Sequence, residues 1–298
     1  MSYMPHINNL YKSQEILLFK ECFVLEKIHG TNAKLVFNPQ ETKELIRFYS
    51  GGEKYLNFLT LFDREKLEII FKSLTLPCDR TTTVFGEAYG GSQQGMSETY
   101  GKQLKFVCFD VAVGDNWLNV LSAEKIVQTL GLEFVYYVKI STDLKEIDAQ
   151  RDADSVQAFR NGMGNGKLRE GVVLRPLIEV KMNNGNRIIA KHKRDEFKET
   201  TTPRKVVDTN LMTVLEDAEA IANEWVTKER LVNHILPKIK NPSIEKMREI
   251  IYAIVEDITR EGKGEIVFNN NVTTAIGRHT AALYKNYLKE QFIAQNKI

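Results

Sequence analysis

Two hydrophobic periodicities divide the chain. Up to about residue 205, short runs of β-branched and aromatic residues recur between turn signals such as Asn38-Pro39 and Gly90-Gly91. Runs of this kind predict strands, and helical spacing occurs there at 61–74 and 122–130. The predicted strands are CFVLE, AKLVF, ELIRFYS, TTTVFGEAY, LKFVCFDVAV, EFVYYV, GVVLRP and NRIIAKH. This mixture predicts an α+β domain built on antiparallel sheets.

After residue 208 the spacing is helical. Apolar residues fall on one helical face at Ile244, Met247, Ile250, Ile251, Ile254, Val255 and Ile258. Asn241 is the expected cap and Pro242 lies in the first turn. Similar patterns cover 211–225, 229–237 and 273–294. We therefore expect a small all-α domain at 208–298 after an α+β domain at 1–207.

Composition narrows the class of protein. Of 298 residues, 43% are hydrophobic and 27% charged, as in a globular protein, and a net charge of +2 is too small to indicate a polyanion partner. Cys22, Cys78 and Cys108 form no CxxC pair, which fits a reducing compartment. The first residues lack the order of a signal peptide, and no run of about 18 apolar residues occurs. We expect a cytoplasmic monomer that does not cross a membrane.

Lys27 lies where two strand-like runs meet at His29-Gly30. A lysine with an ordinary pKa of about 10.4 is neutral in roughly one molecule in 2,500 at pH 7 and is a poor nucleophile. Burial and neighbouring cations favour the neutral amine, and Gly30 would let the backbone pass close to a ligand. Lys27 is therefore either a hairpin-corner residue on the surface or a nucleophile in a cleft.

Other polar residues interrupt apolar runs in the same way. Glu87 precedes a glycine pair, Asp110 interrupts an apolar strand, and Glu170 begins a run that contains Arg175. Lys191 and Lys193 alternate, so both amines point to one side of a strand. Each has a simpler reading as a solvated strand end, an edge-strand face or a core residue. A phosphate loop at 161–168 is excluded because the GxxxxGK[ST] spacing is missing. The five histidines show no metal-ligand spacing.

Five stretches, in order, resemble the motifs of the covalent lysyl-AMP nucleotidyltransferases. KIHGTN (27–32) is similar to motif I, FGEAYG (85–90) to motif III, FVCFDV (106–111) to motif IIIa, EGVVLRP (170–176) to motif IV and AKHK (190–193) to motif V. The form KxHGTN is typical of the RNA ligase 2 branch, which includes phage and editing ligases. The chain is identified on these motifs as resembling an ATP-dependent RNA ligase of that branch, with a phage-encoded member expected.

The resemblance implies a role for each matching position. Lys27 would take AMP from ATP, Glu170 would hold Mg²⁺ (or Mn²⁺ in its place), and Lys191 and Lys193 would hold the α-phosphate. Phe106 would stack on adenine, with Phe109 as the open alternative, and His29 would act on the metal or RNA end or only close the turn. The remaining nucleotide-binding positions would be Glu26, Ile28, Asn32, Arg47 near the RNA end, and Glu87 at the ribose.

The helical tail bears on the substrate. DNA ligases and capping enzymes resemble this core but follow it with a β-rich domain, so the tail favours RNA ligase 2. The expected activity joins 3′-hydroxyl and 5′-phosphate RNA ends through lysyl-AMP and RNA-adenylate, sealing nicks in duplex RNA. A GTP-using capping transferase and a non-catalytic RNA-end-binding protein are the alternatives. Basic residues of the tail could contact phosphates: Lys228, Arg230, Lys238, Lys240, Lys246, Arg248, Arg278, Lys285 and Lys289.

Overall fold

The computed structural model describes residues 6–74, 76–77, 79–182, 184–197 and 218–295. The chain divides into two compact units, Met1–Arg194 and Asp195–Ile298. The expected domain boundary at 207/208 lies outside the described residues. Each unit has a hydrophobic core of its own, and the two are described separately below.

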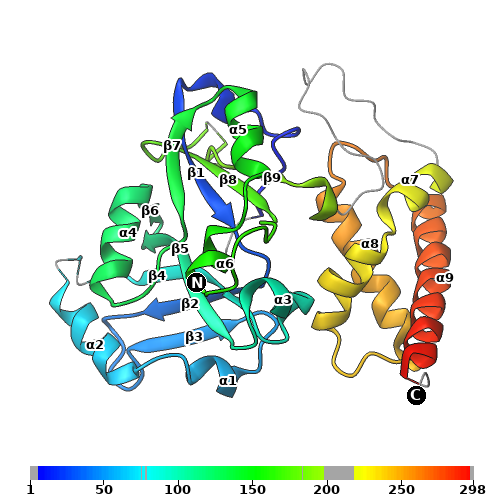
Figure 1. The fold of residues 1–298 in the computed structure, drawn as a ribbon, viewed down its shortest axis with the longest axis horizontal. Coiled ribbons are helices and arrows are strands. Elements are labelled where there is room, and N and C mark those ends of the chain that lie inside the picture. Colours follow the sequence, from blue (N-terminus) through cyan, green and yellow to red (C-terminus); the bar gives the residue numbers. More distant parts are fainter. Residues whose placement is uncertain (1–5, 75, 78, 183, 198–217, 296–298) are drawn as a thin grey trace. The chain divides into compact units, whose positions relative to one another are not determined.

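Two antiparallel sheets form the first unit (Figure 1). The four-stranded sheet has the order β7 (Tyr137–Ser141), β1 (Glu21–Lys27), β8 (Gly171–Pro176) and β9 (Ala190–Lys193). The five-stranded sheet has the order β3 (Ile46–Ser50), β2 (Thr31–Phe37), β4 (Thr82–Tyr89), β5 (Lys105–Val113) and β6 (Asn116–Trp117). The α+β architecture that the sequence predicts is therefore confirmed.

Helices cover the outer faces of these sheets. Strand β2 turns Ala33, Leu35 and Phe37 into the core, and α2 (Arg64–Ser73) adds Phe71, whose ring stacks on Phe37 at 4.8 Å. The alternating apolar residues of β2 and the helically spaced apolar residues of α2 therefore pack against each other in one apolar layer. The other α-helices among the described residues of this unit are α1 (Tyr55–Leu59), α3 (Ser97–Tyr100), α4 (Val120–Thr129), α5 (Leu144–Arg151) and α6 (Val156–Arg160), and 3₁₀ helices lie at Glu15–Leu18 and Gln93–Gly95.

One predicted strand is largely irregular. The run at 133–138 enters β7 only at Tyr137. Its earlier residues instead bond to β5: Cys108 donates its N–H to the carbonyl of Glu133, and Val135 donates to the carbonyl of Cys108, both at 2.8 Å. These backbone groups are therefore satisfied by a single bridge and not by a ladder.

Every named element among residues 218–295 is a helix: α7 (Ala218–Trp225), a π-helix (Arg230–Ile235), 3₁₀ turns (Leu236–Lys238, Ile244–Lys246), α8 (Met247–Glu261) and α9 (Asn270–Gln295). Residues 211–217 of the first expected helix lie outside the described residues. The capping expectation is wrong: Asn241 adopts a left-handed φ of 51°, and α8 begins only after Lys246. The apolar stripe is nevertheless used, since Ile250, Ile254 and Ile258 are fully buried.

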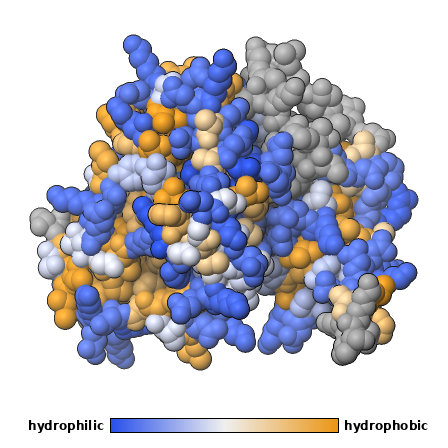
Figure 2. All heavy atoms as spheres, in the orientation of Figure 1, coloured by the Kyte–Doolittle hydropathy of each residue, from blue (hydrophilic) through white to orange (hydrophobic). Residues whose placement is uncertain are grey.

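Within the described residues, no helix has the length and apolar character needed to cross a bilayer. Figure 2 shows hydrophilic side chains over most of the visible face, with hydrophobic patches between them. Large apolar side chains such as Leu56 and Ile69 are exposed to solvent. Scattered exposure of this kind is normal for globular proteins.

Candidate active site

Three charged residues lie at one end of the four-stranded sheet. Lys27 is the last residue of β1, and it pairs with Gly171, which pairs in turn with Lys193, the last residue of β9. Residues directly opposite each other share a face of the sheet. Gly171 lies between the two lysines in this set of paired residues, and because it has no side chain it leaves space between them. The carboxylate of Glu170, the residue just before β8, occupies that space.

Glu170 binds both amines. Lys27 Nζ donates to Oε2 at 2.9 Å, and Lys193 Nζ lies 3.0 Å from Oε1. His29 Nδ1 is 3.5 Å from Oε2. Burial alone would raise the pKa of Glu170, but the charges of Lys27, Lys193 and His29 outweigh it and hold the pKa well below its usual range. The sequence-predicted nucleophile, metal-binding carboxylate and one phosphate-binding lysine thus form one cluster.

Strand β9 alternates as predicted. Lys191 pairs with Val173, which borders the same cavity as Lys27, so Lys191 faces the cavity side with Lys193. His192, between them, points the other way, and its Nε2 lies 2.7 Å from Asp148 Oδ1 of α5. Both lysines are buried. Two buried cations on one strand face form a ready site for phosphate oxygens.

Glu87 lies beside this cluster on β4, directly across from Asn32 of β2. Burial raises the pKa of Glu87 to about 8, although the Lys27 and Lys193 charges and the Gly30 N–H act against it. Near pH 7 the carboxyl is therefore largely protonated and can donate a hydrogen bond as well as accept one. Such a group suits a ribose hydroxyl.

A cavity of about 230 Å³ separates the two sheets next to Lys27. From the four-stranded sheet it is bordered by Leu25, Val173 and Arg175, and from the five-stranded sheet by Asn32, Glu87, Phe109 and Asp110. Glu26, Ile28, Ile7 and Ile189 complete its walls. Mostly apolar walls with a few polar groups are typical of small-molecule sites.

The structure differs from the expectation at Phe106. Its ring packs edge-on against Phe58 and Phe62, with centroids 5.5 and 5.4 Å apart, and does not border the cavity. The cause is the register: Phe106 pairs with Ala88, whereas Val107 pairs with Glu87 on the cavity face, and Phe109 lies two residues beyond Val107 on β5. A β-bulge follows, because Gly86 pairs with Cys108 but Phe85 pairs with Asp110, and it brings Asp110 to the same face. Phe109 and Asp110 therefore both border the cavity, and of the two phenylalanines Phe109 is the one on its wall.

Glu26 has a structural use. Its carboxylate accepts hydrogen bonds from Ser155 Oγ at 2.6 Å, Val156 N at 3.0 Å and Gln157 N at 3.2 Å. It therefore ties β1 to the start of α6. Burial, set against these hydrogen bonds and the Arg169 charge, raises its pKa. The resemblance implies that Glu26 contacts the nucleotide, and the structure shows that its carboxylate also orders the site around β1 and α6.

Arg47 does not border the Lys27 cavity. It forms ion pairs with Glu41 at 3.0 Å and Glu44 at 3.7 Å. It borders a second, polar cavity of about 710 Å³ that Lys34 and Tyr49 also border. Because Arg47 pairs with Val36, four residues from Asn32, both cavities open on the same face of the five-stranded sheet.

The described residues contain no group of three or more His, Cys, Asp or Glu side chains that could hold a metal ion. Mg²⁺ commonly binds through one or two carboxylates together with substrate phosphates. Glu170, ionised and next to the cavity, fits that arrangement.

Several tail residues expected at RNA phosphates are already paired. Arg230 is buried against Asp257, Lys228 lies 2.6 Å from Glu290, and Arg278 pairs with Glu219. The expectation for Arg230 is wrong, because a fully buried guanidinium cannot reach RNA. Lys238 and Lys240 are exposed on the surface of the helical unit.

Comparisons with known proteins find RNA ligases, both as a family model and among solved structures. A family model described as RNA ligase matches residues 20–193. The solved structures that resemble the chain include Naegleria gruberi RNA ligase with PPi (17% identity, TM-score 0.49, 66% of this chain and 57% of that one). They also include mutants of that ligase with ATP and Mn (17%, 0.49, 65% and 57%) and with AMP and Mn (16%, 0.46, 65% and 56%). The chain thus covers little more than half of those proteins. No curated protein matches.

Two antiparallel sheets around a lysine-bordered cavity, followed by a helical region, define a nucleotidyltransferase fold. The matched segment contains all five motifs and covers more than half of the chain. The protein belongs to the RNA ligase family.

Proposed function

We propose that the protein is an ATP-dependent RNA ligase that uses Lys27 as its nucleophile. The carrying observation is the cluster in which Glu170 lies 2.9 Å from Lys27 and 3.0 Å from Lys193, beside a cavity between two sheets. Phe109, not Phe106, stacks on the adenine, Glu87 binds the ribose, and Asn32 and Ile28 border the nucleoside. Relatives with ATP, AMP and Mn support this choice of nucleotide and metal.

The reaction has three transfers. The Lys27 amine, after losing a proton, bonds to the α-phosphorus of ATP while the bond to the bridging oxygen breaks and pyrophosphate leaves. An RNA 5′-phosphate oxygen then displaces the lysine from that phosphorus. Finally the RNA 3′-hydroxyl attacks the 5′-phosphorus, and AMP departs as the strand closes.

The protein contributes charge and position. Negative charge spreads over phosphoryl oxygens during such transfers, so fixed cations lower the barrier. Lys191 and Lys193 supply them from one strand face. Mg²⁺ or Mn²⁺, held by Glu170 and the triphosphate, would supply further neutralisation. Lys27 must exchange its ion pair with Glu170 for the phosphorus, and Glu170 would then be the carboxylate that holds the metal.

The substrate is proposed to be nicked duplex RNA. The helical unit takes the place of the β-rich domain of DNA ligases and capping enzymes, and Arg47 is proposed to lie near an RNA end. A-form duplexes are read mainly by shape and 2′-hydroxyls, so little base specificity is expected. A monomeric state in the cytoplasm stays a prediction.

Covalent labelling tests the nucleophile. We expect label from α-³²P-ATP with Mg²⁺ to stay on the protein in a denaturing gel and to be lost in acid, as a phosphoramidate is. Label from γ-³²P-ATP should not stay, because pyrophosphate leaves. Lys27→Ala should remove all labelling while circular dichroism is unchanged, and persistent label would exclude Lys27.

The same gel separates the alternatives. Label from GTP instead of ATP would indicate a capping-type transferase, and no label from either would indicate a binding protein. Nicked duplex RNA with a 5′-phosphate should then be sealed faster than single-stranded ends. A duplex whose nick lacks the phosphate is the matched control and should accumulate no product.

A further inference from the structure

Three residues that directly precede proposed catalytic side chains contact one segment of the chain. This α5–α6 segment covers residues 148–157, from the last turn of α5 to the first turn of α6. Glu26, which precedes Lys27, accepts three hydrogen bonds from the start of α6. Arg169, which precedes Glu170, donates three hydrogen bonds to backbone carbonyls of the same segment. The segment therefore holds the neighbours of both members of the Lys27–Glu170 pair.

The third neighbour is His192, which lies between the two lysines of β9. Its Nε2 lies 2.7 Å from Asp148 Oδ1 and 2.8 Å from Arg151 Nη1, both on α5. Just beyond β9, Arg194 Nη1 donates to the carbonyl of Asp152 at 2.7 Å. Successive side chains of a strand point to opposite faces of the sheet. The α5–α6 segment thus supports the four-stranded sheet from the face opposite the phosphate-binding lysines.

The Arg169 side chain anchors the backbone just before Glu170. It is buried, and its Nε and Nη2 donate to the carbonyl of Asp154 at 3.1 and 2.7 Å. Its Nη1 donates to the carbonyl of Gln150 at 3.0 Å. Hydrogen bonds from an ionised donor are stronger than those between neutral groups, and the planar guanidinium fixes their geometry. Arg169 therefore ties its own stretch of backbone to the α5–α6 segment.

This anchor matters because the strand pairing of β8 begins only after Glu170. The register with β1 and β9 starts at Gly171. Before Glu170 the chain makes a largely exposed turn, in which Gly164 and Gly166 adopt φ values of 79° and 77° with open space where a Cβ would lie. Arg169 lies between this loosely packed turn and the catalytic carboxylate. Its hydrogen bonds carry the hold of the α5–α6 segment to the residue next to Glu170.

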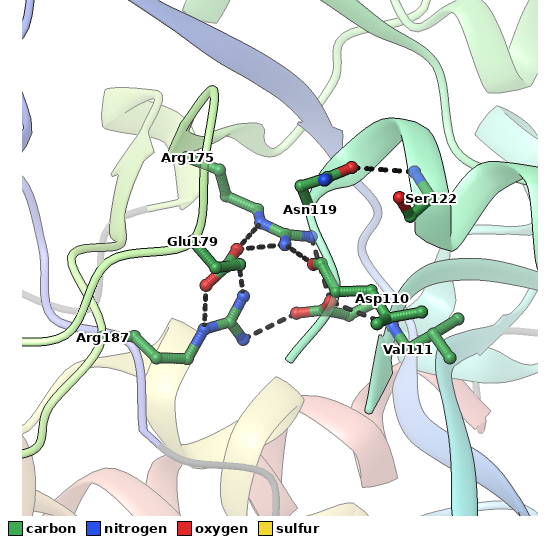
Figure 3. Close-up of polar contacts among 8 residues, drawn as sticks. Asp110, Val111, Asn119, Ser122, Arg175, Glu179 and Arg187 are labelled. Atoms are coloured by element: carbon green, nitrogen blue, oxygen red, sulfur yellow. Dashed lines mark hydrogen bonds and ion pairs between the residues drawn. The ribbon is translucent and has the colours of Figure 1, made fainter. Parts of the chain in front are cut away.

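A second buried ionic cluster of the same unit is placed differently (Figure 3). Asp110 accepts from Arg175 Nη1 at 3.0 Å and from Arg187 Nη1 at 2.7 Å. Glu179 accepts from Arg187 Nε and Nη2 at 2.9 and 2.8 Å. None of these four residues directly adjoins a proposed catalytic residue in the sequence. Arg187, whose side chain is 5% exposed, therefore offers a buried guanidinium for comparison with Arg169.

From these contacts we propose that Arg169 is a positioning residue for Glu170: through the α5–α6 segment it places the carboxylate where it meets Lys27 and the catalytic metal. The proposal rests on the proposed function, in which Glu170 holds Mg²⁺. Mg²⁺ demands near-ideal octahedral geometry, so displacement of a ligating carboxylate weakens its binding. Groups that support a metal ligand from behind typically change metal affinity or activity by about 10–100-fold when removed.

Labelling kinetics with α-³²P-ATP separate positioning from folding. We expect Arg169→Met to lower the rate at saturating ATP about 30-fold and to raise the Mg²⁺ concentration for half-maximal rate about tenfold. The ATP concentration for half-maximal rate should change less than about threefold, because Phe109 and Glu87 lie on the other sheet and stay in place. Arg169→Lys keeps the charge and can donate to one carbonyl, so it should recover part of the rate.

A binding measurement without turnover tests the same claim. Isothermal titration calorimetry uses α,β-methylene-ATP, which cannot transfer AMP to Lys27, with and without Mn²⁺. The wild-type protein should bind the analogue about tenfold more tightly with Mn²⁺, and Arg169→Met should lose most of this gain while its metal-free Kd stays the same. Glu170→Gln is the reference for a lost carboxylate. The double variant should bind no more weakly than Glu170→Gln alone.

Arg187→Met is the matched control, since it removes a buried guanidinium of the same unit from Asp110 and Glu179. It should lower thermal stability and leave both the Mg²⁺ requirement and the gain from Mn²⁺ unchanged. If Arg169→Met does not fold, Arg169→Lys carries the same measurements, with smaller shifts in the same direction.

Four results would overturn the proposal: a wild-type Mg²⁺ requirement in a folded Arg169 variant, equal losses for Arg187→Met, additive losses in the double variant, or no gain from Mn²⁺ in the wild-type protein. Failure of the proposed function looks different. In that case the wild-type protein never retains α-label from ATP, and the calorimetric comparison still shows whether Arg169 acts on Glu170.

Discussion

At the scale of single residues, the site depends on groups whose surroundings change their chemistry. Glu170 and Glu87 are neighbouring carboxyl groups with opposite pKa shifts, one lowered by lysines and one raised by burial. Two carboxyl groups whose pKa values are shifted in opposite directions can have different protonation states, and therefore different roles, at one pH. Glu170 is ionised for cations, and Glu87 is largely protonated near neutrality.

The raised pKa of Glu87 predicts a pH dependence of stability. Its folded pKa of about 8 exceeds the ordinary 4.5, so its stabilising contribution is complete below pH 4.5 and is lost as pH rises through 8. Glu87→Gln cannot titrate. The free energy of unfolding of the wild type should therefore fall relative to Glu87→Gln between pH 5 and pH 8.

Urea unfolding followed by Trp117 fluorescence, in a Trp225→Phe background, reports this unit. Glu170 does not interfere, because its lowered pKa means that its contribution is lost only as pH falls below about 4.5. Parallel curves for the two proteins across pH 5–8 would contradict the assignment.

Gly171 predicts a steric requirement. A Cβ there would lie 2.3 Å from the His192 carbonyl and 2.7 Å from Lys193 Cα. Gly171→Ala should destabilise the protein by about 2–4 kcal/mol and reduce covalent labelling strongly, because it pushes β9 away from Glu170. Gly164→Ala is the control: it shares a positive φ, but nothing lies within 4 Å of its Cβ. It should cost about 1 kcal/mol of stability and leave labelling intact.

At the scale of elements, the sequence predicted most strands but not their irregularities. Lys191 and Lys193 could be assigned to one face because β9 alternates regularly. Phe109 could not be chosen over Phe106 in this way, because the two lie on opposite faces of β5 and only the pairing with β4 shows which face borders the cavity. The bulge was hidden as well, and it shifts the residues from Asp110 onward. The ion pairs around Asp110 were equally hidden: Asp110 and Arg175 are visible as charges in apolar runs, but only the fold shows that Glu179 and Arg187 neutralise them.

The opposite faces of β5 give a prediction that separates Phe106 from Phe109. Phe106→Ala should lower stability by about 3 kcal/mol through lost packing on Phe58 and Phe62, with nucleotide affinity almost unchanged. Phe109→Ala should instead raise the ATP concentration needed for half-maximal labelling about tenfold with a smaller loss of stability. Thermal unfolding measures the loss of stability, and labelling rates measure the dependence on ATP. The reverse pattern would indicate that Phe106, and not Phe109, stacks on adenine.

At the scale of the whole molecule, a net charge of +2 gives little general attraction for RNA. Affinity for RNA must therefore come from local clusters of lysine and arginine, and several of these residues in the helical unit already form ion pairs such as Lys228–Glu290. The sequence predicted the helical character of this unit from periodicity alone. The sequence alone could not show which lysines and arginines form ion pairs, because their acidic partners lie on other helices.

Lys238 and Lys240 remain exposed and give a prediction for RNA binding. Changing both to Glu should weaken binding of nicked duplex RNA and reduce the slope of log K against log salt by about 1–2, because fewer counterions are released. Covalent labelling by ATP should not change. The double change Lys285→Glu/Lys289→Glu on α9 is the comparison, and equal effects from both pairs would argue for nonspecific attraction.

The strands that pair with β1, which ends at Lys27, come later in the sequence and are therefore synthesised after it. The partners of β1 come from β7 and β8, and Asn8 and Leu10 exchange backbone hydrogen bonds with Lys191. A ribosome that stops before residue 170 therefore releases a fragment that contains the nucleophile and neither Glu170 nor the two lysines of β9. Under the proposed function such a fragment could not charge itself with AMP, and self-adenylation would report that synthesis has passed residue 193.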